Sequence, residues 1–153
     1  LLSLMFTQTL KEMFLYFLVL PIGINFLCSY LGSTLISSSQ NTTAVKDFLS
    51  AGYPPLVYIM FVVLACFAIP LIEEVVFRKW IWYFIDRFLG SNHALWLTSV
   101  LFAFLHGGWY GFVLLPFAFY LGYVRKTYGS FKFSTVPHIV FNLTGVLLTL
   151  GGI

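Results

Sequence analysis

The sequence predicts an all-α protein, a multi-pass transmembrane helical bundle with about five spans in this chain. Of its 153 residues, 60% are hydrophobic and 8% are charged, whereas a soluble domain carries about 25% charged residues. Eight Lys and Arg with five Asp and Glu are too few to coat a soluble surface. The high hydrophobicity also excludes a disordered chain, and no basic stripe indicates nucleic-acid binding. The lipid bilayer is therefore the expected partner.

Apolar runs separated by polar or glycine-containing breaks give the expected helices. They cover roughly residues 10–36, 54–89, 93–106, 110–124 and 137–150. The polar stretch 37–52 is expected to be a loop outside the bilayer core. The third and fourth runs are short for a helix that needs about 20 residues to span. Either they continue through Gly107-Gly108, or His106 lies at a break inside the membrane, which only a protein-lined or water-lined site tolerates.

The cationic residues predict an orientation. Five spans place all but one of them on the same side of the membrane, and that side is expected to be cytoplasmic. These residues are Lys11, Arg78, Lys79, Arg87, Arg125, Lys126 and Lys132, against Lys46 alone on the other side. We therefore expect a multi-pass protein of the cell membrane with a cytoplasmic N-terminus. The chain begins at Leu1 without Met, so residues before it are expected to be missing.

Ionisable groups inside spans cost roughly 3 kcal/mol or more each and are functional candidates. Glu74 and Arg78 are four residues apart on a helix and can form an ion pair. Glu73 lies about 100° round the helix and is free to face another surface, where it could act as a general base on water. The alternative is a Glu–Arg cluster anchored at the membrane interface by snorkelling.

Two further polar groups lie in later runs. His106 follows Phe102 by four residues and shares its helix face, as Asn142 does with His138. Each could serve only as a hydrogen-bonding group between helices. Their depth favours a common site. Glu73 lies 17 residues before Gly90 and His106 lies 16 after it, so a hairpin would place both about 25 Å from the turn. His138 and Asn142 follow the break at residue 129 by 9 and 13 residues, or about 14–20 Å.

Three motifs stand in order along the chain. They are Glu73-Glu74-Val75-Val76-Phe77-Arg78, Phe102-Ala103-Phe104-Leu105-His106 and His138-Ile139-Val140-Phe141-Asn142. Together they resemble the CPBP family of intramembrane proteases, which includes the CAAX prenyl endopeptidases and the bacterial bacteriocin-processing and immunity (Abi) proteins. The resemblance covers about Pro55 to Leu150. It implies two regions: an N-terminal transmembrane helix with its outer loop at 1–54, and a CPBP-like protease core at 55–153.

The resemblance also implies roles. Glu73 would be the general base that activates water, helped by His106, while His138 and Asn142 would stabilise the oxyanion or complete a metal site. Supporting roles would fall to Glu74, Arg78 and Phe102. The metal candidates are Glu73, His106 and His138, which match the minimum set for catalytic zinc. His-Glu-x-x-His is absent, and we favour a metal-free water mechanism over zinc.

Three functions fit these residues. The first is an intramembrane endopeptidase acting on a membrane-associated peptide or protein. The second is a non-hydrolytic bacteriocin-immunity protein on the same scaffold. The third is a proton-coupled transporter that uses the same side chains as a relay, which short spans without inverted repeats make less favourable. No prenyl-binding surface is evident in the sequence, so CAAX processing is not assumed.

Overall fold

The structure is a computed structural model that describes residues 9–35 and 47–151. All regular structure in these two segments is helical, which confirms the all-α prediction. Residues 37–46 of the expected outer loop, with Lys46, lie outside the described residues.

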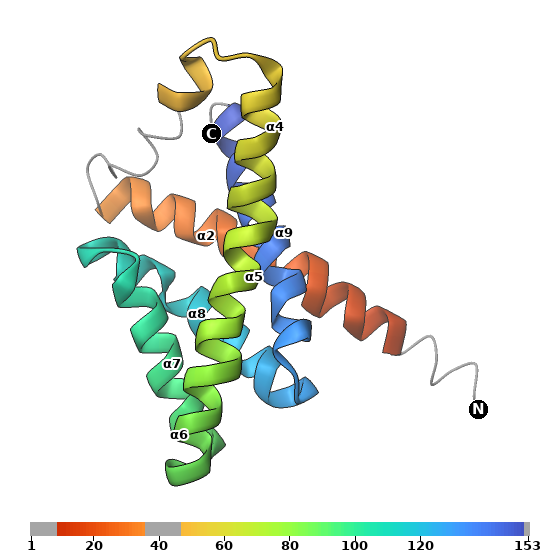
Figure 1. Cartoon of the computed structure of the whole chain (residues 1–153), viewed down its shortest axis with the longest axis vertical. Helices are drawn as coiled ribbons and strands as arrows, with labels where there is room; N and C mark the ends of the chain where they lie inside the picture. The colour runs from red at the N-terminus through yellow and green to blue at the C-terminus, as the bar shows by residue number, and fades with distance from the viewer. Residues whose placement is uncertain (1–8, 36–46, 152–153) are drawn as a thin grey trace.

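Apart from a short helical segment at residues 47–50, the described residues form five consecutive helical units (Figure 1). The first contains the π-helical turn η1 (Leu15–Val19) and α2 (Leu20–Leu35). The second is one uninterrupted helix made of α4 (Pro55–Val63), η2 (Leu64–Ala68), α5 (Ile69–Glu74), η3 (Val75–Ile81) and α6 (Trp82–Leu89). The last three are α7 (Ser91–Leu105), α8 (Gly108–Tyr128) and α9 (Phe131–Leu150).

Three helices within the described residues are long and apolar enough to cross a membrane, namely Thr9–Gly32, Pro55–Leu89 and Phe131–Leu150. Helix α7 is apolar but shorter. Helix α9 begins six residues before the expected start of the fifth run. The reason is local, because the Ser130 side chain accepts a hydrogen bond from the Lys132 N–H and caps the helix. Lys132 therefore belongs to the first turn of α9 instead of to the preceding break.

Glycines with positive φ separate the helices. Gly90 and Gly129 have φ of 86° and 73°, a region that favours glycine. Between α7 and α8, His106 leaves the helical region with φ −79° and ψ 1°, and Gly107 follows with φ 102° and ψ 115°. The helix therefore does not continue through residues 107–108, and His106 lies at the break.

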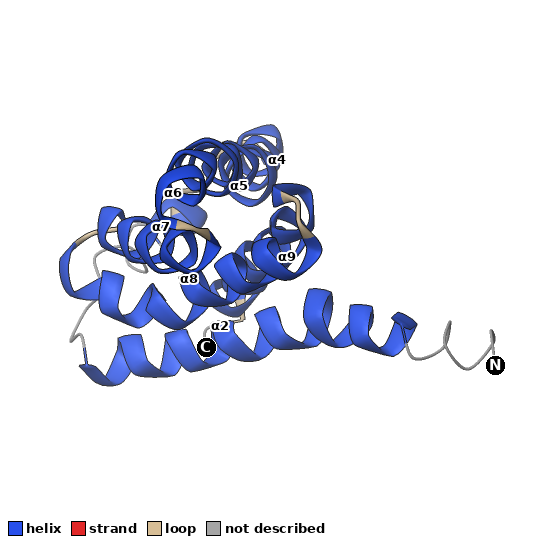
Figure 2. Ribbon diagram, turned by 90° about the horizontal axis from the view of Figure 1, so that it is seen from below, coloured by secondary structure: helices blue, strands red, loops and turns tan. Residues whose placement is uncertain are grey.

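The helices do not all run in the same direction. Figure 1 shows the long helix α4–α6 upright, with α9 packed against its middle part from η2 to η3, and Figure 2 shows the helix containing α2 lying across the bundle. Helix α2 packs against α8 and α9. Asn25 Nδ2 donates to the Phe141 carbonyl at 2.7 Å, and Cys28 Sγ lies 3.1 Å from the Val113 carbonyl oxygen. The predicted boundary at 54/55 thus separates two regions in direct contact.

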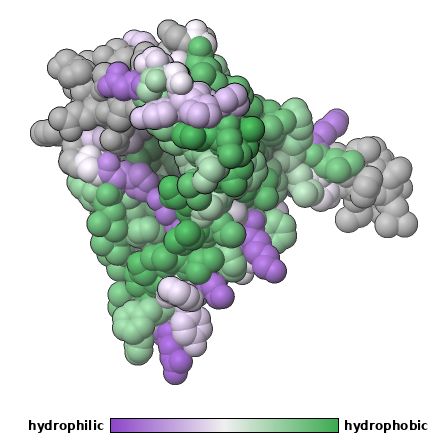
Figure 3. Space-filling view, turned by 45° about the horizontal axis from the view of Figure 1, so that its top comes forward, coloured by the Kyte–Doolittle hydropathy of each residue, from purple (hydrophilic) through white to green (hydrophobic). Residues whose placement is uncertain are grey.

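The outer surface of the protein is largely apolar, as a membrane protein requires. Figure 3 shows hydrophobic residues over most of the visible face. Large apolar side chains such as Ile72 and Leu105 are 61% and 73% exposed. The interior between α7, α8 and α9 holds aromatic side chains, including Phe102, Phe117 and Phe141. Apolar exteriors of this extent are typical of lipid-facing helices.

Candidate active site

The centre of the site is the Glu73 carboxylate at the end of α5. Its Oε1 lies 3.4 Å from His106 Nε2, and its Oε2 lies 3.4 Å from His138 Nε2. One carboxylate thus contacts two imidazoles that come from the end of α7 and from α9. The convergence expected from helix depth is present for these three side chains.

The other imidazole nitrogens define the tautomers. His106 Nδ1 lies 2.7 Å from the Phe102 carbonyl oxygen, and His138 Nδ1 lies 3.1 Å from Glu74 Oε1. A carbonyl and a carboxylate only accept hydrogen bonds, so both Nδ1 atoms carry a proton. Both Nε2 atoms face Glu73 at 3.4 Å, where each imidazole can exchange a proton with the carboxylate.

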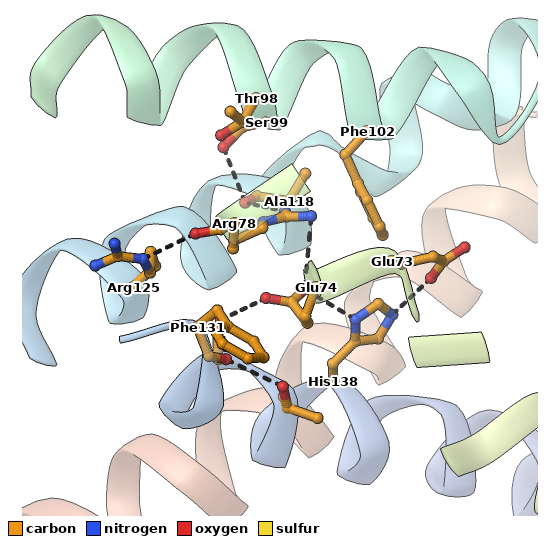
Figure 4. A network of polar contacts seen from close by, with 12 residues as sticks. Glu73, Glu74, Arg78, Thr98, Ser99, Phe102, Ala118, Arg125, Phe131 and His138 are labelled. Carbon is orange, nitrogen blue, oxygen red and sulfur yellow. Dashed lines mark hydrogen bonds and ion pairs between the residues drawn. The ribbon is translucent and has the colours of Figure 1, made fainter. Parts of the chain in front are cut away.

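Glu74 turns away from Glu73 into the protein, where it is fully buried. Its Oε1 lies 3.5 Å from Arg78 Nη1, which confirms the predicted ion pair. Its Oε2 accepts a short hydrogen bond from the Ser134 hydroxyl. Figure 4 shows His138 between Glu74 and Glu73, so that the two neighbouring carboxylates contact opposite edges of one imidazole.

Arg78 joins this site to the neighbouring helices. It is fully buried, and its Nη2 donates to the Ala118 carbonyl on α8 at 3.2 Å. Its guanidinium carbon lies 4.3 Å from the ring centroid of Phe102 on α7, a cation–π contact. An interfacial anchor that snorkels to water does not fit this burial, so the alternative interpretation of the Glu–Arg cluster is wrong. Phe102 also contacts both imidazoles, with ring centroids 4.4 Å from His106 and 5.5 Å from His138.

Asn142 lies one turn beyond His138 and donates from Nδ2 to the Ala65 carbonyl at 2.9 Å. The π-helical turn η2 explains why this carbonyl is available. There the Ile69 N–H donates to the Leu64 carbonyl five residues back. The same five-residue spacing would pair the Ala65 carbonyl with the N–H of residue 70, but residue 70 is proline and has no N–H. One amide hydrogen of Asn142 therefore replaces the missing backbone donor, and the Asn142 side chain also lines the cavity.

A cavity of about 170 Å³ lies between these helices. Its polar lining consists of Glu73, His106, Tyr110, His138 and Asn142, and the remaining lining is apolar. The side chains of Glu73 and His106 are 23% and 31% exposed, whereas that of His138 is 2% exposed. The cavity is therefore accessible from the Glu73–His106 side and closed behind His138.

Sequence reasoning missed two polar side chains here. Ser134 contacts Glu74, and Tyr110 lines the cavity. The sequence could have indicated Ser134, because it precedes His138 by four residues and so shares its helix face. The sequence could not have indicated Tyr110, since the position of Tyr110 depends on the turn at residues 106–107.

Two histidines and a glutamate are donors of the kind that catalytic zinc uses. Within residues 9–35 and 47–151, however, no group of three or more His, Cys, Asp or Glu side chains is arranged to hold a metal ion.

Comparison with known proteins agrees with the motifs. A family model described as type II CAAX prenyl endopeptidase Rce1-like matches residues 55–144, more than half of the chain. No curated protein and no solved structure matches the chain. The matched segment contains all three motifs and every side chain of the site. The chain therefore belongs to the Rce1-like type II CAAX prenyl endopeptidase family, one of the CPBP intramembrane protease families.

Proposed function

We propose that this protein is an intramembrane endopeptidase that hydrolyses a peptide bond with water activated by Glu73 and His106. The observation that carries the proposal is the arrangement of one carboxylate between two imidazole Nε2 atoms, each at 3.4 Å, in an accessible cavity with an otherwise apolar lining. Amide hydrolysis requires a base for water and donors for the oxyanion.

We assign the activation of water and the proton transfer to Glu73 and His106. Both are partly exposed at the accessible side of the cavity, where a water molecule can enter. The water oxygen attacks the carbonyl carbon while Glu73 takes the water proton. His106, fixed at Nδ1 by the Phe102 carbonyl, exchanges protons only through Nε2. It can receive that proton from Glu73 and pass it to the departing amine, so the proton count balances.

We assign the stabilisation of the oxyanion to His138 and Asn142. His138 is buried between Glu73 and Glu74, so that Glu74 accepts the hydrogen bond from its Nδ1–H and its Nε2 faces Glu73. His138 Nε2, when it carries a proton, and the second amide hydrogen of Asn142 are the donors offered to the oxyanion. An apolar surround strengthens such hydrogen bonds relative to water.

The substrate is proposed to be a membrane-associated peptide or protein, because the cavity lies among lipid-facing helices. The family description includes prenylated CAAX processing, so prenylated and unmodified peptides are both needed in a substrate panel. We further propose a multi-pass topology in the cell membrane with a cytoplasmic N-terminus, as the cation bias predicts.

A peptide panel in proteoliposomes tests the activity. The panel contains leader-like, signal-like and prenylated CAAX peptides, and products are identified by mass spectrometry. His106→Gln is expected to lower cleavage about 10²- to 10⁴-fold, the usual contribution of general acid–base groups. His93→Gln is the matched control, because His93 is exposed at the start of α7.

The same variants distinguish the non-hydrolytic alternative. A bacteriocin-immunity protein that acts by binding would protect cells equally with His106→Gln. Retained protection, with no cleavage of any peptide by the unmodified protein, would refute the endopeptidase proposal.

A further inference from the structure

Ser134 is a buried hydroxyl outside the three sequence motifs. It lies on α9 one turn before His138, and its side chain is fully buried. It donates to Glu74 Oε2, and the Phe131 carbonyl oxygen lies 2.9 Å from the same hydroxyl. A hydroxyl has one proton, and the carboxylate is the stronger acceptor. Ser134 is therefore primarily a donor to Glu74.

The two oxygens of Glu74 have different partners. Oε1 faces His138 Nδ1 at 3.1 Å and Arg78 Nη1 at 3.5 Å. Oε2 has the Ser134 hydroxyl. Without that hydroxyl, Oε2 would compete for the Arg78 guanidinium, and rotation of the carboxylate would remove Oε1 from His138. Terminal carboxylate torsions are broad, so a hydrogen bond at Oε2 is needed to hold this orientation.

Helix periodicity makes the arrangement specific. Residues four apart lie on one helix face, so α9 presents Ser134 and His138 to the same carboxylate. The neighbouring Thr135 donates only locally, to the Phe131 carbonyl at 3.0 Å. Thr135 thus has the ordinary back-bonding role of a helical hydroxyl, while Ser134 contacts the site.

We propose that Ser134 is a positioning residue that acts through Glu74 to hold His138 as the Nδ1–H tautomer, with Nε2 directed at Glu73. The effect on catalysis rests on the proposed function, whereas the effect on the tautomer does not. The hydroxyl itself touches no reacting atom.

The direct test is the tautomer of His138. Protein labelled with ¹⁵N-histidine is reconstituted in nanodiscs, and long-range ¹H–¹⁵N correlations report which nitrogen carries the proton. The His138 signal is assigned by its loss in His138→Gln. We expect the Nδ1–H form in the unmodified protein and in Thr135→Val, and mixed tautomers in Ser134→Ala. Ser134→Thr keeps the hydroxyl and is expected to restore the Nδ1–H form.

Kinetics supply the second readout. Loss of a hydrogen bond to a charged group typically costs about 10- to 100-fold, so kcat of Ser134→Ala is expected to fall by that factor with KM nearly unchanged. Ser134→Thr is expected to recover most of the rate. If Ser134→Ala does not fold, Ser134→Cys replaces it, because a thiol is a weak donor of similar size.

Each outcome separates the two proposals. An unchanged His138 tautomer in Ser134→Ala, or an equal change in Thr135→Val, would overturn the positioning role. Mixed tautomers in Ser134→Ala without any peptide cleavage by the unmodified protein would support the positioning role and refute the endopeptidase proposal.

Discussion

Replacing Arg78 with Met is expected to destabilise the protein severely. Both Arg78 and Glu74 are fully buried, and their charged groups lie 3.5 Å apart. Met keeps much of the side-chain length but leaves the Glu74 carboxylate without its cation. It also removes the hydrogen bond to the Ala118 carbonyl and the contact with the Phe102 ring.

The expected loss is about 3–5 kcal/mol, the typical cost of removing one partner of a buried ion pair. Since about 1.4 kcal/mol is a factor of ten, the folded-to-unfolded ratio falls by roughly two to three and a half orders of magnitude. Unfolding by SDS in mixed micelles, followed by tryptophan fluorescence, measures the change. Arg87→Met is the matched control, because Arg87 is exposed near the end of α6 and should change stability by less than about 0.5 kcal/mol.

A double variant checks the reasoning. Glu74→Leu combined with Arg78→Met removes both charges and should recover much of the stability, because an apolar pair of similar volume often replaces a buried ion pair at little cost. Equal stability of Arg78→Met and Arg87→Met would refute the claim that the buried carboxylate depends on Arg78. A double variant no more stable than Arg78→Met would refute its electrostatic origin.

Further variants test packing, the π-helical turn and metal dependence. Gly111→Ala places a Cβ 2.7 Å from a backbone oxygen of α7 and should cost about 1–3 kcal/mol by overpacking, whereas Gly23→Ala, with nothing within 4 Å, should not destabilise. Asn142→Ala removes the donor to the Ala65 carbonyl and should cost about 1–3 kcal/mol. Adding Pro70→Ala supplies a backbone N–H and should restore stability but not cleavage; recovered cleavage would contradict a direct role for the amide. Activity should survive chelation in protein whose metal content is measured, and zinc-restored activity would contradict the metal-free mechanism.

The sequence predicted those features that depend on helix periodicity and on residue positions. The Glu74–Arg78 pair follows from a spacing of four residues, and the breaks at Gly90 and Gly129 follow from residue type. The meeting of Glu73 and His106 follows from the nearly equal numbers of residues, 17 and 16, that separate them from Gly90. Each of these needs only the regular rise and turn of an α-helix.

Other features depend on departures from that regularity. The π-helical turn at 64–68 leaves the Ala65 carbonyl to Asn142, and hydropathy carries no signal for it. The start of α9 at Phe131 depends on a cap by Ser130. The direction of the first helix across the bundle (Figure 2) is not predictable from its length, because packing sets helix tilt.

The central claim is that Glu73 activates the water that cleaves a peptide bond. The most direct measurement is cleavage in H₂¹⁸O by proteoliposomes that contain the unmodified protein, Glu73→Gln or the control Glu12→Gln, which changes an exposed glutamate of the first helix. We predict one ¹⁸O atom in the new carboxylate at equal rates for the unmodified protein and Glu12→Gln. Glu73→Gln should lower the rate about 10²- to 10⁴-fold while inserting normally. Cleavage by Glu73→Gln at the rate of the control would contradict the assignment of Glu73 as the base.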